Sequence, residues 1–223
     1  MEDILKRCIV EPTADGSPTL YQPDLDEHYH SVKGALTESL HVYLDMGWRY
    51  FAGEKVKVFE VGFGTGLNAA LTAQAADCEG KATEYISVEL YPLSSPLTSY
   101  LEGFLEADLL PYYRKVNDAE WDCPTVLHDR FVLDKRLDNI LTMKIPEGLN
   151  VVYFDAFAPE KQPEIWTESV FRRIFASLSH GGVLTTYCAK GCVRRMLEEI
   201  GFKIERLPGP QGGKREILRG IKE

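Results

Sequence analysis

Val56-Lys57-Val58-Phe59-Glu60-Val61-Gly62-Phe63-Gly64-Thr65-Gly66-Leu67-Asn68 is the stretch of sequence that decides the fold. Its first six residues are largely β-branched and apolar, which predicts a strand, and a helical stretch follows the three glycines. Glycines let the backbone turn tightly and approach a ligand closely, while the free N–H groups of the next helix face the crevice beyond the strand ends. The stretch therefore predicts a nucleotide-binding turn.

The spacing within this turn indicates which nucleotide binds there. It is Gly-x-Gly-x-Gly rather than Gly-x-Gly-x-x-Gly, and an acidic residue precedes the first glycine by two positions. A carboxylate there would repel a pyrophosphate but can pair with the cationic methionine end of S-adenosylmethionine. We therefore expect S-adenosylmethionine as cofactor, and an NAD-dependent dehydrogenase is disfavoured. The candidate cofactor-binding residues of the turn are Glu60, Gly62, Phe63, Gly64, Thr65, Gly66 and Asn68.

Around this stretch, strand-like and helix-like segments alternate, which predicts an α/β fold with a mostly parallel sheet covered by helices on both faces. We expect a Rossmann-like architecture of seven strands. The expected strands are residues 56–61, 85–89, 125–128, 150–155, 183–188, 202–207 and 216–220, the last two forming an antiparallel hairpin around the turn-rich residues 208–213. The expected helices are residues 67–76, 97–105, 163–178 and 193–200.

The first 50 residues predict an extension ahead of this core. Two β-like runs, 7–10 and 19–21, flank Asp15-Gly16-Ser17-Pro18, whose residues favour a tight turn and hence a hairpin. Residues 31–50 have apolar positions near the helical period. No repeat or linker marks a second domain, so we expect residues 1–223 to form one domain, with a hairpin and helix over 1–50 and the Rossmann-like core over 51–223.

Acidic side chains follow three of the expected strands. Glu89 ends the second strand of the core, where a carboxylate can accept hydrogen bonds from both ribose hydroxyls, although an exposed strand-end acid is the alternative. Asp129 follows residues 125–128 and is expected to receive the adenine amino group. Asp155 ends the apolar run Val151–Phe154, so it should face the same crevice as the glycine turn, and it is the candidate catalytic residue.

Composition and charge narrow the class of protein. The 223 residues are 44% hydrophobic and 26% charged, as in a globular protein, and the apolar runs are too short to span a bilayer. Residues 1–7 lack the features of a secretory signal, so we expect a cytoplasmic protein. The net charge of −9 disfavours nucleic-acid binding, but it is unevenly spread: residues 1–150 hold 13 Lys+Arg against 25 Asp+Glu, a net −12, and residues 151–223 hold 12 against 9, a net +3.

The five cysteines (8, 78, 123, 188 and 192) are an odd number and contain no Cys-x-x-Cys pair. We interpret them as reduced thiols. Cys188 and Cys192 have no second pair of ligands nearby in the sequence, so we expect no zinc site and no other metal.

Three separated motifs together resemble one family. They are Val61–Asn68, the run Asp155-Ala156-Phe157-Ala158-Pro159-Glu160-Lys161-Gln162-Pro163-Glu164-Ile165-Trp166, and the terminal Gly213-Lys214-Arg215-Glu216. They resemble the methyltransferase domain of the bacterial MnmC tRNA-modifying enzymes, which also occurs alone as MnmD. The resemblance covers nearly the whole chain.

The resemblance implies methyl transfer from S-adenosylmethionine to the 5-aminomethyl group of 5-aminomethyl-2-thiouridine at the tRNA wobble position, giving 5-methylaminomethyl-2-thiouridine. The flavin oxidase domain of the long MnmC chains has no counterpart, so another tRNA-modifying enzyme would have to supply the amine. The resemblance also places Tyr29 at the cofactor pocket and Lys161 beside the target nucleotide, and Lys214 and Arg215 are candidate contacts to tRNA phosphates.

Two other functions stay open at this stage. A methyltransferase for a small amine, such as a polyamine, would suit the acidic first two thirds of the chain. A non-catalytic module that binds S-adenosylmethionine would retain the same fold and the same glycine turn.

Overall fold

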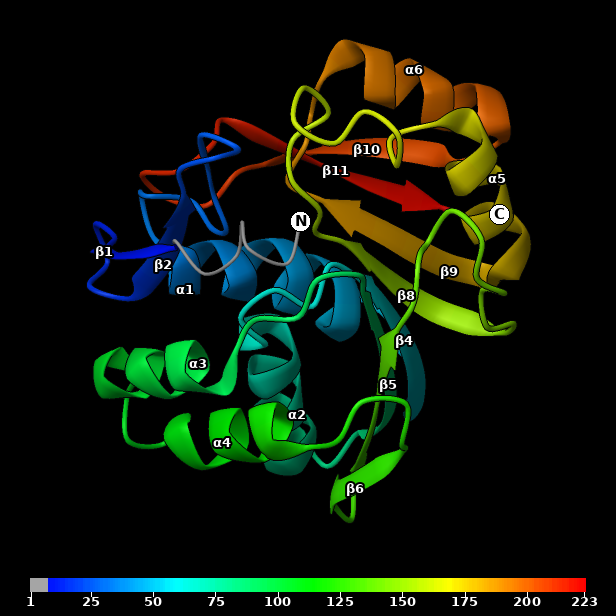
Figure 1. Ribbon diagram of the computed structural model, residues 1–223. Helices are drawn as coiled ribbons and strands as arrows, with labels where there is room; N and C mark the ends of the chain where they lie inside the picture. The colour runs from blue at the N-terminus through cyan, green and yellow to red at the C-terminus, as the bar shows by residue number, and fades with distance from the viewer. Residues whose placement is uncertain (1–7) are drawn as a thin grey trace.

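The computed structural model describes residues 8–223, and Arg7, which begins the first expected β-run, lies outside the described residues. An eight-stranded sheet with the order β10-β11-β9-β8-β4-β5-β7-β6 forms the centre of the molecule (Figure 1). Its five middle strands are parallel, while β6, β10 and β11 run antiparallel to their neighbours. The strands are β4(Lys55–Val61), β5(Ala82–Glu89), β6(Thr125–His128), β7(Phe131–Leu137), β8(Leu149–Phe154), β9(Leu178–Thr186), β10(Lys203–Pro208) and β11(Glu216–Ile221).

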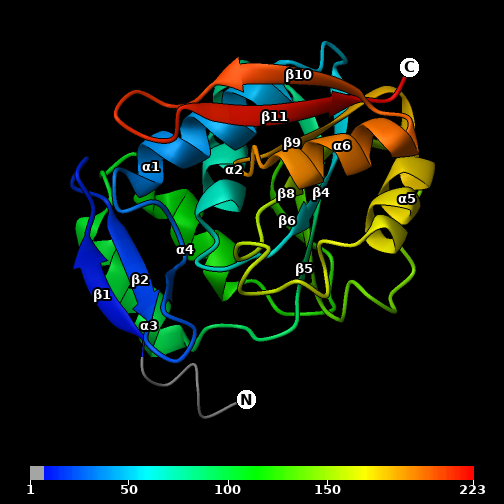
Figure 2. The same cartoon turned by 90° about the horizontal axis from the view of Figure 1, so that it is seen from above.

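Helices cover both faces of this sheet, as Figures 1 and 2 show. One face carries the π-helix η2(Ser39–Arg49), which continues α1(Ala35–Glu38), together with α2(Leu67–Glu79) and α4(Leu110–Asp118). The other carries α5(Glu168–Ser177) and α6(Gly191–Ile200). A further helix, α3(Ser95–Leu101), continues into the short 3-10 helix η3(Glu102–Phe104) and contacts α4.

Strand alternation divides the core into two clusters, one on each face of the sheet. In β4, Val58 packs under η2 and α2 while Phe59 packs under α5 and α6, and Tyr153 and Phe154 of β8 divide in the same way. Successive side chains of a strand point to opposite faces, so Glu60 faces the same side as Val58. This direction places a carboxylate inside the layer of η2 and α2.

The α/β architecture and the parallel core are confirmed, with eight strands rather than seven. The added strand is β7, which the sequence analysis missed because Lys135 occupies an inward position after Phe131 and Leu133 and breaks the apolar alternation. The segment 125–128, expected as a parallel core strand, is instead the edge strand β6, antiparallel to β7. Helix α4 was also missed, and α5 begins at Glu168 rather than at Pro163.

The expected N-terminal hairpin is present. Strands β1(Ile9–Pro12) and β2(Pro18–Gln22) pair around Gly16, and β3(Glu27–His28) adds a third short strand to this separate sheet, which lies near α1 and α3 in Figure 2. All five cysteines are free thiols. Within residues 8–223, no helix is long and apolar enough to cross a membrane, and no three potential metal ligands cluster together.

Candidate active site

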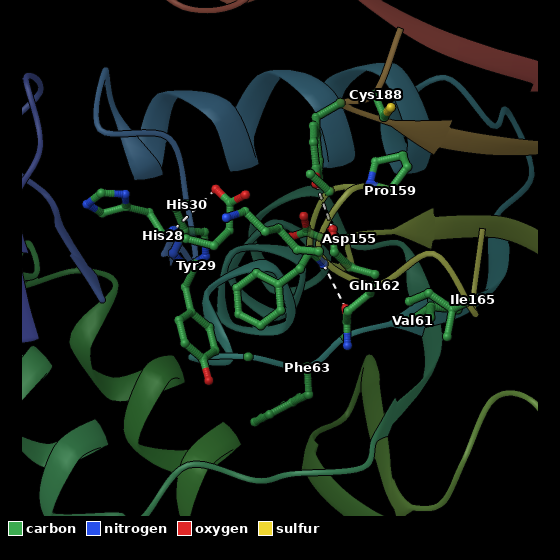
Figure 3. Close-up of a pocket in the computed structure, with 18 of the residues that line it drawn as sticks. His28, Tyr29, His30, Val61, Phe63, Asp155, Pro159, Gln162, Ile165 and Cys188 are labelled. Carbon is green, nitrogen blue, oxygen red and sulfur yellow. Dashed lines mark hydrogen bonds between the residues drawn. The ribbon is translucent and has the colours of Figure 1, made fainter. Parts of the chain in front are cut away.

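A cleft of about 1020 Å³ opens at the carboxyl ends of the parallel strands. Gly62 after β4, Glu89 at the end of β5, Asp138 after β7, Asp155 after β8 and Tyr187 after β9 all line it. Residues 27–32 of the N-terminal extension and residues 156–159, 161 and 162 also line the cleft, and Figure 3 shows both segments around Asp155. Ligands of open α/β sheets bind at this edge, so the topology alone makes the cleft the candidate site.

The glycine turn brings the backbone of β4 against that of β8. A Cβ atom on Gly62, whose φ is +93°, would lie 2.4 Å from the carbonyl oxygen of Asp155. Only glycine fits there, because both the positive φ and the close approach exclude a side chain. The Asp155 N–H donates to the Val61 carbonyl at 3.0 Å, so the turn also fixes where Asp155 leaves the sheet.

Two carboxylates, that of the buried Glu60 and that of the half-buried Asp155, meet at one amide beside this turn. Asn68 Nδ2 donates to Glu60 Oε1 at 3.1 Å and to Asp155 Oδ2 at 2.8 Å. The hydroxyl of Ser87 donates to Glu60 Oε2 at 2.7 Å, and that of Tyr43 donates to Asp155 Oδ1 at 2.6 Å. Both carboxyl groups thus accept from the same amide nitrogen, which fixes the orientation of the Asn68 side chain.

Burial raises the pKa of both acids, because a charged carboxylate loses its hydration there. The pKa of Asp155 rises to about 7, opposed by the hydrogen bonds from Tyr43 and Asn68. The pKa of Glu60 rises to about 8, and the neighbouring charge of Asp155 contributes to this shift. Asp155 lines the cleft and Glu60 does not, so only Asp155 can exchange a proton with a bound substrate directly.

The donor and acceptor groups of the cleft fit S-adenosylmethionine. The Asn68 side chain is 4% exposed and its Oδ1 atom has no hydrogen-bond partner within the described chain, which suits the ammonium group of a methionine moiety. Glu89 is held by N–H groups: Gly64 N donates to Oε2 at 3.3 Å, and Leu90 N and Tyr91 N each donate to Oε1 at 2.9 Å. This fixed carboxylate is suited to ribose hydroxyls.

The structure separates the residues of the glycine turn into two groups. Gly62, Phe63, Gly64 and Asn68 line the cleft together with Tyr29, whose ring lies against Gly64. Thr65 and Gly66 do not line it. Thr65 is 3% exposed, and Gly66, with φ at +81°, is the N-cap of α2 and packs on Phe63 and Val116. Both therefore build the turn without reaching the ligand space.

The prediction that Glu60 pairs directly with the cofactor is wrong. Glu60 is completely buried and does not line the cleft, because strand alternation turns it under α2. It acts on the cleft through Asn68, whose amide it orients.

The prediction that Asp129 contacts adenine is also wrong. Asp129 lies in the turn between β6 and β7, beside Lys55, Ala82 and Asn150 at the amino ends of the strands. The error follows from the direction of β6. The next acid at the carboxyl edge is Asp138, directly after β7, and it lines the cleft.

The motif after Asp155 forms a wall rather than a helix. Phe157 N donates to Gln162 Oε1 at 3.1 Å, and Trp166 Nε1 donates to the Phe157 carbonyl at 2.8 Å, so the segment folds back on itself. Trp166 is 7% exposed and packs on Phe154 in the core. Lys161 lines the cleft, and its Nζ lies 3.7 Å from Asp26 Oδ2.

The two basic residues of the terminal motif differ in position. Lys214 reaches into the cleft, where its Nζ lies 3.4 Å from the centre of the Tyr187 ring and 3.3 Å from Glu38 Oε1. Both residues are exposed, Lys214 with 41% of its side chain, but Arg215 does not line the cleft.

Sequence reasoning did not assign a role to Tyr43, Glu38 or Asp138. The first two belong to a helix whose apolar spacing indicates packing, so the sequence held no signal for them. Asp138 would have been found if residues 131–137 had been recognised as a strand.

Comparisons with known proteins agree with this geometry. A family model described as S-adenosyl-L-methionine-dependent methyltransferase matches residues 128–223. The "tRNA 5-methylaminomethyl-2-thiouridine biosynthesis bifunctional protein MnmC" of Cupriavidus metallidurans is 32% identical over 93% of this chain, and that of Cupriavidus necator is 35% identical over 91%. This chain spans about a third of the length of these relatives, 33% and 32% respectively. The sequence similarity confirms the resemblance to MnmC.

Solved structures confirm the fold. MNMC2 from Aquifex aeolicus matches with a TM-score of 0.79 at 23% identity, over 97% of this chain and 70% of that chain. Spermidine synthase from Thermotoga maritima matches with a TM-score of 0.57 at 13% identity, over 97% of this chain and 73% of that chain.

Proposed function

We propose that this chain, a relative of the MnmC proteins with the fold of S-adenosyl-L-methionine-dependent methyltransferases, methylates an amine on tRNA. The substrate is the 5-aminomethyl group of 5-aminomethyl-2-thiouridine at the wobble position, and the product is 5-methylaminomethyl-2-thiouridine. The observation that carries the proposal is the position of Asp155, a carboxylate at the cleft edge of β8, beside the glycine turn and held by Tyr43 and Asn68. The nucleoside is the one contained in the names of the MnmC relatives.

The cofactor side of the cleft is built from β4, β5 and β7. Gly62 and Gly64 let the ligand approach the backbone, Asn68 Oδ1 accepts from its ammonium group, and Glu89 accepts from the ribose hydroxyls. Asp138 takes the place that the sequence analysis gave to Asp129, next to the adenine. S-adenosyl-L-methionine supplies an electrophilic methyl group at this site.

Asp155 positions the attacking nitrogen. Its carboxylate accepts a hydrogen bond from the neutral amine, directs the lone pair towards the methyl group and stabilises the positive charge that develops on nitrogen. Tyr43 donates to Oδ1 of Asp155 at 2.6 Å and Asn68 donates to Oδ2 at 2.8 Å. The carboxylate is therefore already oriented and needs little reorganisation during methyl transfer. The N–C bond forms as the C–S bond breaks, and the extra proton on nitrogen then leaves to Asp155 or to water.

The substrate side is formed by the cleft walls beside Asp155. Tyr29 and Phe157 contact each other edge to face, with ring centres 5.0 Å apart, and Lys161 lies on the same wall. Arg215 stands outside the cleft on the mildly basic C-terminal third, where a contact to tRNA phosphate is available. An upstream tRNA-modifying enzyme supplies the aminomethyl group.

The test uses purified protein, labelled S-adenosylmethionine and tRNA from cells that lack the modification, followed by digestion and identification of the nucleoside. We expect label in 5-methylaminomethyl-2-thiouridine, and Asp155→Ala should lose most turnover while retaining much of the cofactor affinity. Label in a small amine without any tRNA would replace this proposal with the small-amine function. Cofactor binding without turnover on either substrate would support a binding module.

A further inference from the structure

Lys214 brings a positive charge to a proposed site whose carboxylates would otherwise favour an unreactive, protonated amine. A carboxylate beside an amine favours the protonated ammonium, which has no lone pair for attack. The cleft holds the half-buried Asp155 and also Glu38, a buried acid that is 6% exposed. Two anions around one amine would favour its protonated form still more. A cation at the same place would favour the neutral amine.

Lys214 forms an ion pair with Glu38. Glu38 Oε2 accepts from the N–H of Ser31 at 3.0 Å, whereas its Oε1 atom is buried without a hydrogen-bond partner and has the ammonium of Lys214 at 3.3 Å. A buried carboxylate needs a compensating charge, which holds the lysine inward. The Tyr187 ring supports the ammonium from the other side at 3.4 Å, and Tyr187 in turn donates to the Ala156 carbonyl at 2.8 Å, next to Asp155.

The loop that carries Lys214 is held close to its own hairpin. Gly209 N donates to the Arg215 carbonyl at 3.0 Å, and a Cβ atom on Gly209 would overlap the carbonyl oxygen of Lys214. Lys214 therefore enters the cleft from a fixed backbone position, and Arg215, the next residue, points out of it.

Several titratable groups act on Asp155 from the elements packed around it. Lys214 lowers the pKa of Asp155 through its charge, and Glu38 raises it. Among the described residues, the titratable groups that act on this carboxylate include Glu38 on α1, Tyr43 on η2, Glu60 on β4, Tyr85 on β5, Tyr187 after β9 and Lys214 on the terminal hairpin. Lys214 supplies the positive charge in this set.

We propose that Lys214 is a positioning residue of the methyl-transfer site, whose ammonium, held by Glu38 and Tyr187, favours the ionised form of Asp155 and the neutral form of the bound amine. This assignment rests on the proposed function and replaces the expected contact between Lys214 and tRNA phosphate. The amine releases its proton to solvent as it enters, because the ammonium form would lie beside a fixed cation.

The first experiment measures the methylation rate on tRNA against pH. Lys214→Gln should move the midpoint of the rising limb of the rate profile up by about one pH unit, because a nearby unit charge shifts the pKa of a carboxyl group by one unit or more. The methylation rate should fall by about tenfold at pH values below this limb and recover at high pH. Lys214→Arg should keep the wild-type midpoint, and Glu38→Gln should move it down. A loss of activity uniform across pH in Lys214→Gln would overturn the proposal.

Arg215→Gln is the matched variant one residue away. A phosphate contact predicts a higher KM for tRNA and a weaker salt dependence with an unchanged pH midpoint. If Lys214→Gln behaves in this way too, Lys214 is a phosphate contact and the positioning role is refuted.

A second experiment does not depend on tRNA. A carbon-13 NMR titration of the aspartate carboxyls in the free protein, assigned with Asp155→Asn, should show a higher pKa for Asp155 in Lys214→Gln than in the wild type. An unchanged pKa would refute the role of Lys214. Absence of tRNA methylation by the wild-type protein would refute only the proposed function, since the titration is decisive without it.

Discussion

Removing the hydroxyl of Tyr43 tests how the protein controls the charge of Asp155. This hydroxyl donates to Asp155 Oδ1 at 2.6 Å from η2, on the opposite side of the carboxyl group from Asn68. A hydrogen bond to a charged group contributes about 1.5–3 kcal/mol, which corresponds to roughly one to two pKa units. Tyr43→Phe should therefore raise the pKa of Asp155 from about 7 to roughly 8–9.

The activity should follow from the ionised fraction of Asp155. At pH 7 this fraction is about one half in the wild type and between about a tenth and a hundredth in Tyr43→Phe, so turnover should fall by about 5- to 50-fold. Raising the pH to 9.5 should restore most of the difference, because Asp155 ionises again. The assay is the initial rate of methyl transfer to undermodified tRNA at saturating cofactor from pH 6 to pH 10.

Tyr113→Phe is the matched control. Its hydroxyl is also buried, has no hydrogen-bond partner within the described chain and lies on α4 outside the cleft. It should leave the pH profile unchanged. A loss in Tyr43→Phe that is the same at every pH, or wild-type activity at pH 7, would refute the electrostatic role of this hydrogen bond.

Three further predictions concern stability and the cofactor. Because the folded-state pKa of Asp155 is about 7 against an ordinary value of 3.8, its contribution to stability is present below pH 4 and is lost as the pH rises to about 8. The shift of roughly three pKa units corresponds to about 4 kcal/mol, so Asp155→Asn should gain on the order of 4 kcal/mol over the wild type between pH 4 and pH 8 in urea unfolding, and a constant difference would contradict this. Glu89→Gln places an amide against three backbone N–H groups and should weaken S-adenosylhomocysteine binding by about tenfold in calorimetry, while unchanged affinity would exclude Glu89 from the ribose site. Asp138→Asn should weaken the same binding by about fivefold and Asp129→Asn should not, and the reverse order would restore the original assignment of Asp129.

The sequence by itself determined the class of fold and the edge of the sheet at which the site lies. The strand, glycine turn and helix of residues 56–68 form a local unit, and local patterns can be read from consecutive residues. The same holds for Asp155 and Glu89, since each directly follows or ends an apolar strand whose direction in the sheet was correctly expected.

Only the tertiary structure decided how the acids are used. Glu60 was read as a ligand because it precedes the glycine turn, but the face of the strand on which it lies buries it under α2. The prediction for Asp129 failed because the direction of β6 depends on its pairing with β7. The buried Lys135 interrupts the apolar pattern of β7, so this strand is not evident from the sequence. Neither property is encoded in the spacing of neighbouring residues.

The contacts that tune Asp155 join residues that are remote in the chain. Tyr43 precedes it by 112 residues and Asn68 by 87, while Lys214 and Glu38 meet from the two ends of the sequence. Hydrogen bonds and ion pairs act over a few ångströms in space, whereas sequence patterns report only on neighbours along the chain. The sequence therefore determined that a carboxylate lies at this edge of the sheet, and the tertiary contacts determined its pKa.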